Sequence, residues 1–256
     1  MKIATWNVNS LRAREDVVLN WVEANRPDVL CMQETKVTDQ EFPEDGFGDL
    51  DCETAFFGQP NYNGVAIAST LDLHDVVRGF PGDPPDAERR IISARIAGID
   101  VISIYLPNGQ AVDSEKYRFK LSWIDRLVAH LHERFDASKP VVLCGDFNIA
   151  PSELDHYWPA SKERTLFTTP EERAAYARIL DFGFVDAYRL LHESERAYTW
   201  WDYRGRTFQR NEGMRIDHLL VTRSLLPRVK AVEVHRDERA QQGPSDHVPV
   251  VLVLED

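Results

Sequence analysis

The sequence predicts a layered α/β sandwich, in which two packed β-sheets are covered by helices on their outer faces. Short β-branched apolar runs recur from one end of the chain to the other, and a few amphipathic helical segments lie among them. No internal repeat, low-complexity tract or long linker divides the 256 residues, a length that one hydrophobic core still serves. We therefore expect a single domain over residues 1–256.

The apolar runs are expected to be strands because they are short and rich in β-branched residues. They cover residues 3–8, 29–32, 65–68, 91–96, 101–106, 141–143, 219–221, 229–234 and 248–254. The clearest helix is expected over residues 114–135, where apolar side chains recur at three- and four-residue steps and so share one face. These side chains are Tyr117, Leu121, Ile124, Leu127, Leu131 and Phe135.

Two weaker helices are expected over residues 10–24 and 170–180. The second opens Pro-Glu-Glu, which places carboxylates where the helix dipole favours them. Segments rich in Pro, Gly and Asp are expected to be loops, and they cover residues 42–51, 80–86 and 242–245.

Composition excludes several classes of protein. No apolar run approaches the roughly 18 residues of a membrane span, so no membrane partner is expected. Three cysteines without a CxxC pair predict neither a disulfide framework nor a thiolate metal site, and no signal-peptide pattern opens the chain, so a cytoplasmic protein is expected. With 30 basic and 42 acidic side chains, the formal net charge of −12 argues against a broadly basic nucleic-acid-binding module.

Polar residues able to bind a metal recur where the expected strands end, which is where α/β folds tend to build sites. They are Asn7, Glu34, Tyr105, Asn108, Asp146, Asn148, Asp217, Asp246 and His247. Each one alone is more often a loop or turn residue. As a set, the carboxylates and amides form a hard, oxygen-rich group of donors suited to Mg²⁺ or Mn²⁺ and unsuited to structural zinc.

Spacing predicts which of these side chains share a face. Asp146 and Asn148 are two residues apart, so they point the same way if the backbone is extended there. Asp246 and His247 are adjacent, so they share a site only if a turn over residues 243–245 presents them both.

Among the eight histidines, His247 is the functional candidate. A carboxylate such as Asp217 that accepts its ring N–H would orient the imidazole and keep it protonatable near neutral pH. It could then bind a phosphate oxygen or take a proton from water. His218 follows Asp217 on the same expected strand, so it faces the opposite way and is expected to be structural.

A series of motifs runs along nearly the whole chain in a fixed order. The motifs are TWNVNSLRAR, PDVLCMQETK, NYNGVAIAS, FPGD followed by ERRII, GDFNIAP, TWWDYR, RIDHLLV and PSDHVPV. The series resembles the exonuclease III type of apurinic/apyrimidinic endonuclease, within the endonuclease/exonuclease/phosphatase superfamily. The resemblance implies an α/β fold of two packed, mainly antiparallel β-sheets flanked by helices, which is a four-layer α/β sandwich.

The resemblance also implies the activity: Mg²⁺- or Mn²⁺-dependent hydrolysis of phosphodiesters in duplex DNA, 5′ to an abasic site, by in-line attack of water. Related 3′-phosphatase, 3′-phosphodiesterase and 3′–5′ exonuclease activities are implied at 3′ ends. The implied metal-binding residues are Asn7, Glu34, Asp146, Asn148, Asp246 and His247. We expect the protein to act as a monomer.

Catalytic roles follow from the same resemblance. Tyr105 is implied to contact the phosphate or the leaving oxygen, and Asn148 to bond the scissile phosphate. Asp146 is implied to orient and deprotonate the attacking water, and Asp217 to pair with His247. Whether Asp146 or His247 is the general base stays open at this point.

Charge is segregated along the sequence. Residues 196–223 contain six arginines against three acids, whereas residues 34–53 contain eight acids and one lysine. An arginine-rich loop beside aromatic side chains is typical of surfaces that grip a nucleic-acid backbone and stack on bases or sugars. The candidate DNA-binding residues are Asn108, Arg89, Arg90, Trp200, Trp201, Arg204, Arg206, Arg210 and Arg215.

Alternation along a strand predicts that one of Trp200 and Trp201 is buried while the other lines a pocket for an extruded abasic sugar, and the resemblance favours Trp200 for the pocket. Arg89 and Arg90 fit a second phosphate contact or a solvated strand edge.

Three alternatives stay open. The first is an enzyme that acts mainly on 3′ ends, the second a superfamily phosphatase of small phosphoesters, and the third a non-catalytic binding protein on the same scaffold. The segments 39–51 and 155–169 are expected to influence the balance of activities.

Overall fold

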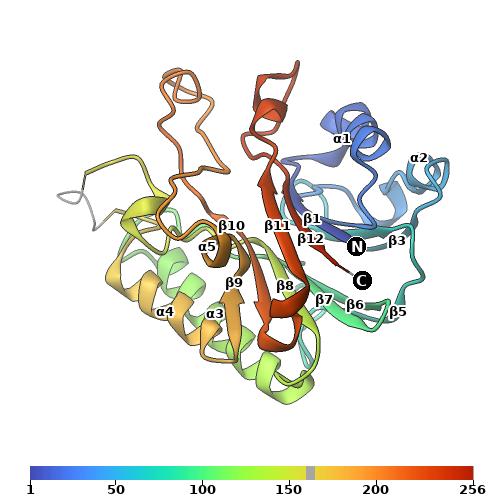
Figure 1. Cartoon of the computed structure of the whole chain (residues 1–256), viewed down its shortest axis with the longest axis horizontal. Helices are drawn as coiled ribbons and strands as arrows, with labels where there is room; N and C mark the ends of the chain where they lie inside the picture. The colour runs from blue at the N-terminus through green and yellow to red at the C-terminus, as the bar shows by residue number, and fades with distance from the viewer. Residues whose placement is uncertain (160–164, 256) are drawn as a thin grey trace.

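Two six-stranded sheets pack face to face in the computed structural model, which describes residues 1–159 and 165–255 (Figure 1). Part of the 155–169 segment, residues 160–164, therefore lies outside the described residues. The strands of the first sheet are β1 (Lys2–Asn7), β2 (Val29–Gln33), β3 (Glu53–Phe57), β4 (Val65–Ser69), β11 (Val229–Val234) and β12 (Val250–Leu254), in the order β11-β12-β1-β2-β4-β3.

The strands of the second sheet are β5 (His74–Arg78), β6 (Ile91–Ile96), β7 (Ile99–Tyr105), β8 (Val141–Asp146), β9 (Phe184–Asp186) and β10 (Asp217–Thr222), in the order β5-β6-β7-β8-β10-β9. The α-helices are α1 (Leu11–Asn25), α2 (Glu44–Gly48), α3 (Glu115–Arg134), α4 (Pro170–Leu180) and α5 (Ala187–Leu191). Within the described residues, no helix is both long and apolar enough to span a membrane.

Four layers result, as expected. α1 and α2 bury side chains such as Trp21 and Phe47 against the outer face of the first sheet. α3 and α4 bury Trp123, Leu127 and Ile179 against the outer face of the second. A third apolar cluster lies between the sheets. Most strand pairs are antiparallel, with one parallel pair in each sheet, β1 with β2 and β7 with β8.

The helices α3 and α4 begin at capping residues that their sequences contain. The Ser114 hydroxyl accepts a hydrogen bond from the backbone N–H of Tyr117 at 3.1 Å. Thr169 and Glu172 form a capping box, with Pro170 at the first helical position. These caps satisfy N–H groups that would lack partners inside the helix, which is why the predicted boundaries agree with the structure to within one residue.

The strands β3, β5 and β9 are missing from the sequence-based prediction. All three lie at sheet edges. The side chains of β3 and β5 are largely half or fully exposed, so these strands lack the continuous apolar run of an inner strand. β9 is mostly buried but has only three residues, too few to show a strand pattern. The prediction of a loop over residues 42–51 was also wrong in part, because α2 lies there and packs Phe47 into the core. Five-residue helices such as α2 and α5 are too short to show a helical period.

Strand register places the site at one end of the sandwich. The parallel pairs bring the carboxyl ends of β1 and β2, and of β7 and β8, to the same edge. In the second sheet Asp146 pairs directly with Tyr105 on one side and with Asp217 on the other. Three candidates far apart in the sequence therefore lie next to one another across neighbouring strands.

His218 faces away from that site, as expected, and is fully buried on the other face of β10. Its Nε2 bonds the carbonyl of Ile149 at 2.9 Å, and its Nδ1 lies 3.0 Å from a guanidinium nitrogen of Arg215. Burial first, and then the Arg215 charge, lower the pKa of His218 to about 4.

This shift predicts a pH-dependent stability difference. Between about pH 6.5 and pH 4, His218 is protonated in the unfolded chain but stays neutral in the folded protein. As the pH falls through this range, the unfolding free energy of wild type should therefore decrease by about 3 kcal/mol more than that of His218→Gln. Denaturant unfolding of both proteins at pH 7 and pH 4.5 measures this difference. Groups present in both proteins, such as Asp146, cancel in the comparison. Parallel pH curves for the two proteins would contradict the prediction.

Candidate active site

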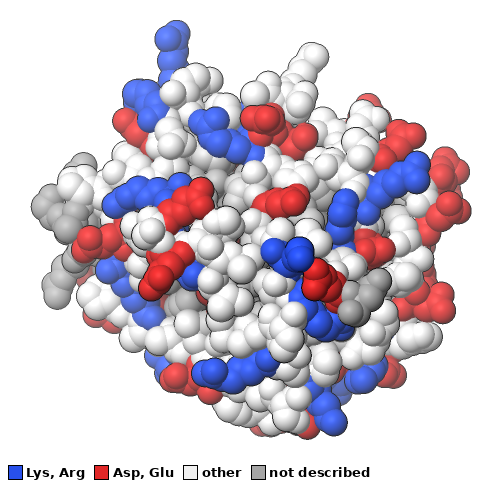
Figure 2. Space-filling model, viewed as in Figure 1, with Lys and Arg blue, Asp and Glu red and all other residues white. Residues whose placement is uncertain are grey.

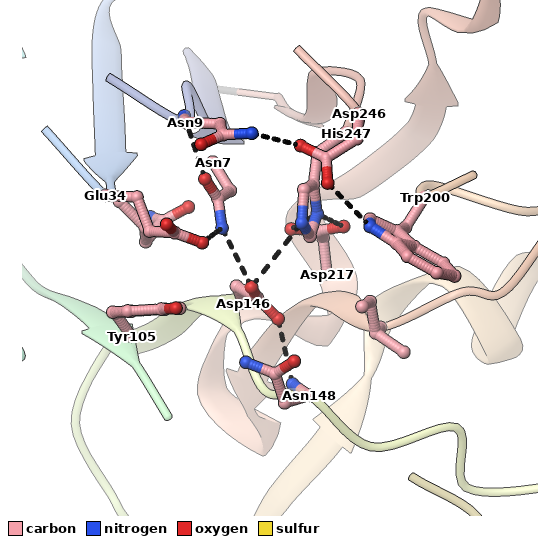
Figure 3. A network of polar contacts seen from close by, with 12 residues as sticks. Asn7, Asn9, Glu34, Tyr105, Asp146, Asn148, Trp200, Asp217, Asp246 and His247 are labelled. Carbon is pink, nitrogen blue, oxygen red and sulfur yellow. Dashed lines mark hydrogen bonds and ion pairs between the residues drawn. The ribbon is translucent and has the colours of Figure 1, made fainter. Parts of the chain in front are cut away.

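Six segments of the two sheets each contribute polar side chains to one buried cluster (Figure 3). The contributions are Asn7 at the end of β1, Glu34 just after β2, Tyr105 at the end of β7, Asp146 at the end of β8, Asp217 at the start of β10, and Asp246 with His247 just before β12. Sequence reasoning named every one of these residues, and the structure brings them together.

Asn7 links the two sheets at the centre of the cluster. Its Nδ2 donates to Glu34 Oε1 at 2.9 Å and to Asp146 Oδ2 at 2.9 Å. Glu34 also pairs through Oε2 with the Lys36 ammonium at 2.8 Å. The backbone φ of Glu34 is +50°, which is uncommon for a residue with a side chain and is typical of positions held by a functional constraint.

His247 is oriented by Asp217. The ring Nδ1 lies 2.9 Å from Asp217 Oδ2, and the ring Nε2 lies 3.7 Å from Asp146 Oδ2. Thr199 donates its hydroxyl proton to Asp217 Oδ2 at 2.6 Å, which fixes the carboxylate in turn. His247 therefore presents Nε2 toward Asp146, the geometry that a Nδ1-anchored imidazole provides.

The two central groups have shifted pKa values. Burial raises the pKa of Asp146 to about 7, and the nearby Asp217 and Glu34 charges act in the same direction against the lowering by His247. Burial lowers the pKa of His247, but the charges of Asp217 and Asp146 outweigh it and raise this pKa to about 10. At neutral pH His247 is an imidazolium that donates, whereas Asp146 titrates where a general base is most effective.

Removing the Asp217 charge is expected to move the alkaline limb of the pH profile. If turnover needs protonated His247, activity persists below the pKa of His247 and falls as pH rises through it. Asp217→Asn removes the largest influence that raises this pKa, so the limb should move from near pH 10 toward neutrality by at least about one unit. Turnover of both proteins from pH 6 to pH 10.5 measures this shift, and coincident limbs would refute the assignment.

The residues present fit a divalent cation. Side-chain donor atoms of Glu34, Asp146 and His247 lie within 4.8 Å of one another, the one such group of acidic, His or Cys side chains among the described residues. The predicted metal contact of His247 conflicts with its raised pKa, because a protonated imidazole has no lone pair for a metal, so the two carboxylates are the ligands this group offers.

Carboxylates are the hard ligands that Mg²⁺ and Mn²⁺ prefer. The Asn7 amide faces them with its NH₂ group, while its Oδ1 accepts from the Asn9 backbone N–H at 3.0 Å. A cation here would also be attracted by the charges of Asp217 and Glu34, which add to burial in raising the pKa of Asp146.

Asp246 belongs to the polar cluster but not to the group of Glu34, Asp146 and His247 whose donor atoms lie within 4.8 Å of one another. Its Oδ1 accepts from Asn9 Nδ2 at 2.9 Å, and its Oδ2 accepts from the indole N–H of Trp200 at 3.0 Å. A turn holds Asp246 and His247 toward one site, as the spacing required, because the Ser245 hydroxyl bonds the Asn7 carbonyl at 2.7 Å. A direct role of Asp246 in cation binding stays a prediction.

Asn148 reaches the site by a different route from the expected one. The backbone is not extended after Asp146, since Asn148 has a φ of +49° and its N–H donates to Asp146 Oδ1 at 2.9 Å. The Asn148 amide donates to the Leu106 carbonyl at 2.9 Å and accepts from Asn108 Nδ2 at 3.2 Å. This tight turn, rather than strand alternation, places both side chains at one end of β8.

Tyr105 stays protonated. Burial, followed by the charges of Glu34 and Asp146, raises the pKa of its phenol well above the usual value. The guanidinium of Arg90 lies 4.6 Å from the centre of the Tyr105 ring and donates to the Tyr105 carbonyl at 3.2 Å. Arg90 is largely buried and pairs with Glu88, so it supports Tyr105 and is badly placed for the predicted DNA contact.

Trp200 and Trp201 differ in burial. Trp201 is fully buried in a cluster with Tyr198 and Val248, so its predicted DNA contact is wrong. Half-buried Trp200 packs instead against an apolar wall beside the carboxylates. That apolar wall consists of the buried Ala150, Met214 and Ile216 and the partly buried Trp158 and Phe167, and the sequence analysis assigned none of them a role in the site.

The predicted DNA contact of Arg215 is also wrong. It is 1% exposed, and its guanidinium pairs with Asp155 at 2.7 Å and with Asp186 at 2.8 Å. Such a group has no free donor face for a phosphate, so Arg215 is structural. Burial lowers the pKa of Arg215, but the charges of Asp186 and Asp155 outweigh burial and raise this pKa above its usual value. Burial raises the pKa of Asp155, but the charge and hydrogen bond of Arg215 outweigh it and lower this pKa below its usual value.

The other predicted arginines lie at the surface. Arg204, Arg206 and Arg210 are exposed on the loop between α5 and β10, and Arg89 is half buried against Asp39. Figure 2 shows basic side chains at the upper left, where Figure 1 draws this loop, and acidic ones along the right edge near α2. The charge segregation of the sequence is thus also spatial.

Sequence reasoning missed residues that hold the site without being ligands. Lys36 pairs with Glu34, Thr199 holds Asp217, and Asn9 connects Lys36 to Asp246. Their only signal in the sequence was proximity to named candidates within the motifs. Their partners are set by contacts between segments that only folding brings together.

Comparisons with known proteins agree with this geometry. The model of the Endonuclease/Exonuclease/phosphatase family matches residues 4–247. "Exodeoxyribonuclease III" from Haemophilus influenzae is 37% identical over 98% of both chains. An AP endonuclease structure from Archaeoglobus fulgidus is 43% identical with a TM-score of 0.96 over the whole of both chains. A 3′ phosphatase from Neisseria, bound to a product DNA hairpin, is 39% identical with a TM-score of 0.95 over the same extent.

The ordered motifs, the two-sheet sandwich with its site at one end, and these full-length similarities lead to one conclusion: the chain belongs to the Endonuclease/Exonuclease/phosphatase family, and its relatives are exodeoxyribonucleases and AP endonucleases.

Proposed function

We propose that this protein is a DNA repair nuclease that hydrolyses the phosphodiester 5′ to an abasic site in duplex DNA and also removes blocking groups, phosphates or nucleotides from 3′ ends. The observation that carries the proposal is the convergence of Glu34, Asp146 and His247, with half-buried Trp200 bonded to the neighbouring Asp246 at the start of the arginine-rich loop. The names of the relatives support both activities.

In the proposed mechanism, the Asp146 carboxylate orients a water molecule and takes its proton, since its pKa near 7 suits a general base. Protonated His247 donates from Nε2 to a phosphate oxygen. Tyr105, kept protonated, donates to the phosphate or the leaving oxygen, and Asn148 holds the phosphate.

Glu34 and Asn7 would hold a Mg²⁺ ion, or Mn²⁺ in its place, with Asp246 on the other side, which leaves Asp146 free to act as the base. Such an ion supplies electrostatic stabilisation of the charge that develops on the phosphate and leaving oxygens.

Substrate recognition follows from the surroundings of the cluster. Half-buried Trp200 packs on the buried Met214 and Ile216, and its indole N–H donates to Asp246, so its apolar face is suited to a sugar that lacks its base. The exposed Arg204, Arg206 and Arg210 would bind phosphates along the duplex. Neither feature is needed for a small phosphoester, which disfavours the superfamily phosphatase alternative.

Incision of a duplex with one stable abasic analogue tests the proposal. We expect Mg²⁺-dependent cleavage on the 5′ side of the analogue that EDTA abolishes, and removal of phosphate from a nicked 3′-phosphate duplex. Asp146→Asn serves as the matched negative control. Removal of the 3′-phosphate without incision at the analogue would assign the protein to 3′-end processing. Hydrolysis of a small aryl phosphate alone would overturn the DNA substrate.

We also propose that residues 1–256 act as a single domain, as a monomer, and in the cytoplasm. Light scattering on the purified protein, with and without the abasic duplex, measures the oligomeric state. A dimeric mass in either sample would refute the monomer.

A further inference from the structure

Lys120, on α3, is a fully buried lysine directly behind the active site. Its Nζ donates to the backbone carbonyl of Asn148 at 2.7 Å and approaches the carbonyl of Asn108 at 3.4 Å. The same ammonium forms an ion pair with Glu172 on α4, whose side chain is equally buried. The Lys120 ammonium thus connects α3 and α4 to the turns at Asn108 and Asn148, whose side chains are candidates for binding phosphate.

The turn at Asn148 needs such a contact. Its φ of +49° is costly for a residue with a side chain, so the conformation persists only where the surroundings fix it. The Asn148 N–H is bonded to Asp146, and the amide side chain to Leu106 and Asn108. The remaining polar group of the residue is its carbonyl, which is the group that Lys120 bonds.

Glu172 compensates the charge of the buried ammonium. Its Oε1 accepts from Lys120, and its Oε2 accepts from the N–H and hydroxyl of Thr169 at 3.0 Å each, within the capping box of α4. The charge of Lys120 is therefore compensated, and the position of its Nζ is set by the packing of α3 against α4. Glu172 itself contacts none of the site residues named above.

We propose that Lys120 is a positioning residue for the reaction, which holds the Asn148 turn so that the Asn148 amide meets the scissile phosphate. The inference rests on the proposed function for its kinetic consequence, but the positioning itself is a property of the free protein. Lys120 touches no reacting atom, so its effect must pass through Asn148.

Two variants separate the hydrogen bond from the ion pair. Glu172→Gln keeps Lys120 and its bond to the Asn148 carbonyl while removing the compensating charge. Lys120→Met with Glu172→Gln removes the bond as well and leaves no unpaired charge. Both should lose thermal stability, but we expect kcat within about twofold of wild type for the first and at least tenfold lower for the second, with KM little changed. Equal kcat in the two folded variants would overturn the proposal.

A cycle with Asn148→Ala distinguishes positioning from general damage. If Lys120 acts through the Asn148 side chain, the double variant should lower kcat no further once that side chain is absent. An undiminished loss in the Asn148→Ala background would overturn the proposal. Lys120→Leu with Glu172→Gln removes the same hydrogen bond with a shorter apolar side chain, so it repeats the test should the first double variant fail to fold. Wild-type kcat in this folded variant would contradict the proposal equally.

Hydrogen exchange provides a readout without substrate. The peptide over residues 146–150 should exchange faster in the double variant than in Glu172→Gln, because the Asn148 turn loses its anchor. Unchanged exchange would refute the positioning even if wild type proved inactive on DNA. Faster exchange together with inactive wild type would instead retain the positioning and refute the proposed function.

Discussion

Replacing Asp146 by asparagine is expected to lower kcat for incision by about 10³-fold, within the range that loss of a general base costs, while DNA affinity survives. Asparagine has the same shape and can still meet Asn7, but it cannot take a proton from water. The variant leaves the exposed arginines of the loop unchanged. Single-turnover cleavage together with fluorescence anisotropy of a labelled abasic duplex measures the two effects.

Asp72→Asn is a suitable control, because Asp72 is exposed and its substitution removes the same charge from the protein. Its kcat should match wild type. If Asp146→Asn lost DNA binding as severely as it lost turnover, Asp146 would have to be a structural residue rather than the base.

Replacing Glu34 by glutamine should have the second largest effect, on the metal requirement. The Mg²⁺ concentration for half-maximal activity should rise by at least the roughly 10- to 100-fold that loss of an outer-shell partner costs, because an anionic ligand is removed. Glutamine also leaves Lys36 without its partner at 2.8 Å, which places an uncompensated charge beside the cation. Activity titrations with Mg²⁺ and direct calorimetric titration of Mg²⁺ measure the change.

Glu41→Gln provides the matched comparison. Glu41 follows Glu34 in the same acidic stretch but is exposed and pairs with Arg12 at the surface. It should leave the Mg²⁺ dependence unchanged. An equal rise for both variants would mean that the metal responds to the acidity of the whole stretch and not to a ligand at Glu34.

The net charge of −12 was a poor guide to the partner, and the structure shows why. Part of the acidity belongs to the cluster of Glu34, Asp146, Asp217 and Asp246, whose charges are internal and partly matched by His247 and Lys36. Another part lies near α2, away from the exposed arginines (Figure 2). A sum over the sequence cannot represent this separation, because electrostatic attraction depends on where charges lie.

The burial of individual arginines is a property that the sequence did not predict. Arg204 and Arg215 belong to the same basic stretch and are equivalent in composition, yet one is exposed and the other is fully buried. Arg215 is buried because Asp155 and Asp186, 60 and 29 residues away in the chain, come to it in the fold. No local pattern contains that information.

By itself, the sequence determined the inner strands, the two long capped helices α3 and α4, and the polar side chains at strand ends, because burial on both faces, capping and strand termination all act over a few residues. Only the tertiary structure decided which of those side chains meet. The parallel pairs and the register of Asp146 with Tyr105 and Asp217 depend on contacts between distant segments. The left-handed turn at Asn148 and the buried Lys120 behind it depend on the docking of α3 and α4, for the same reason.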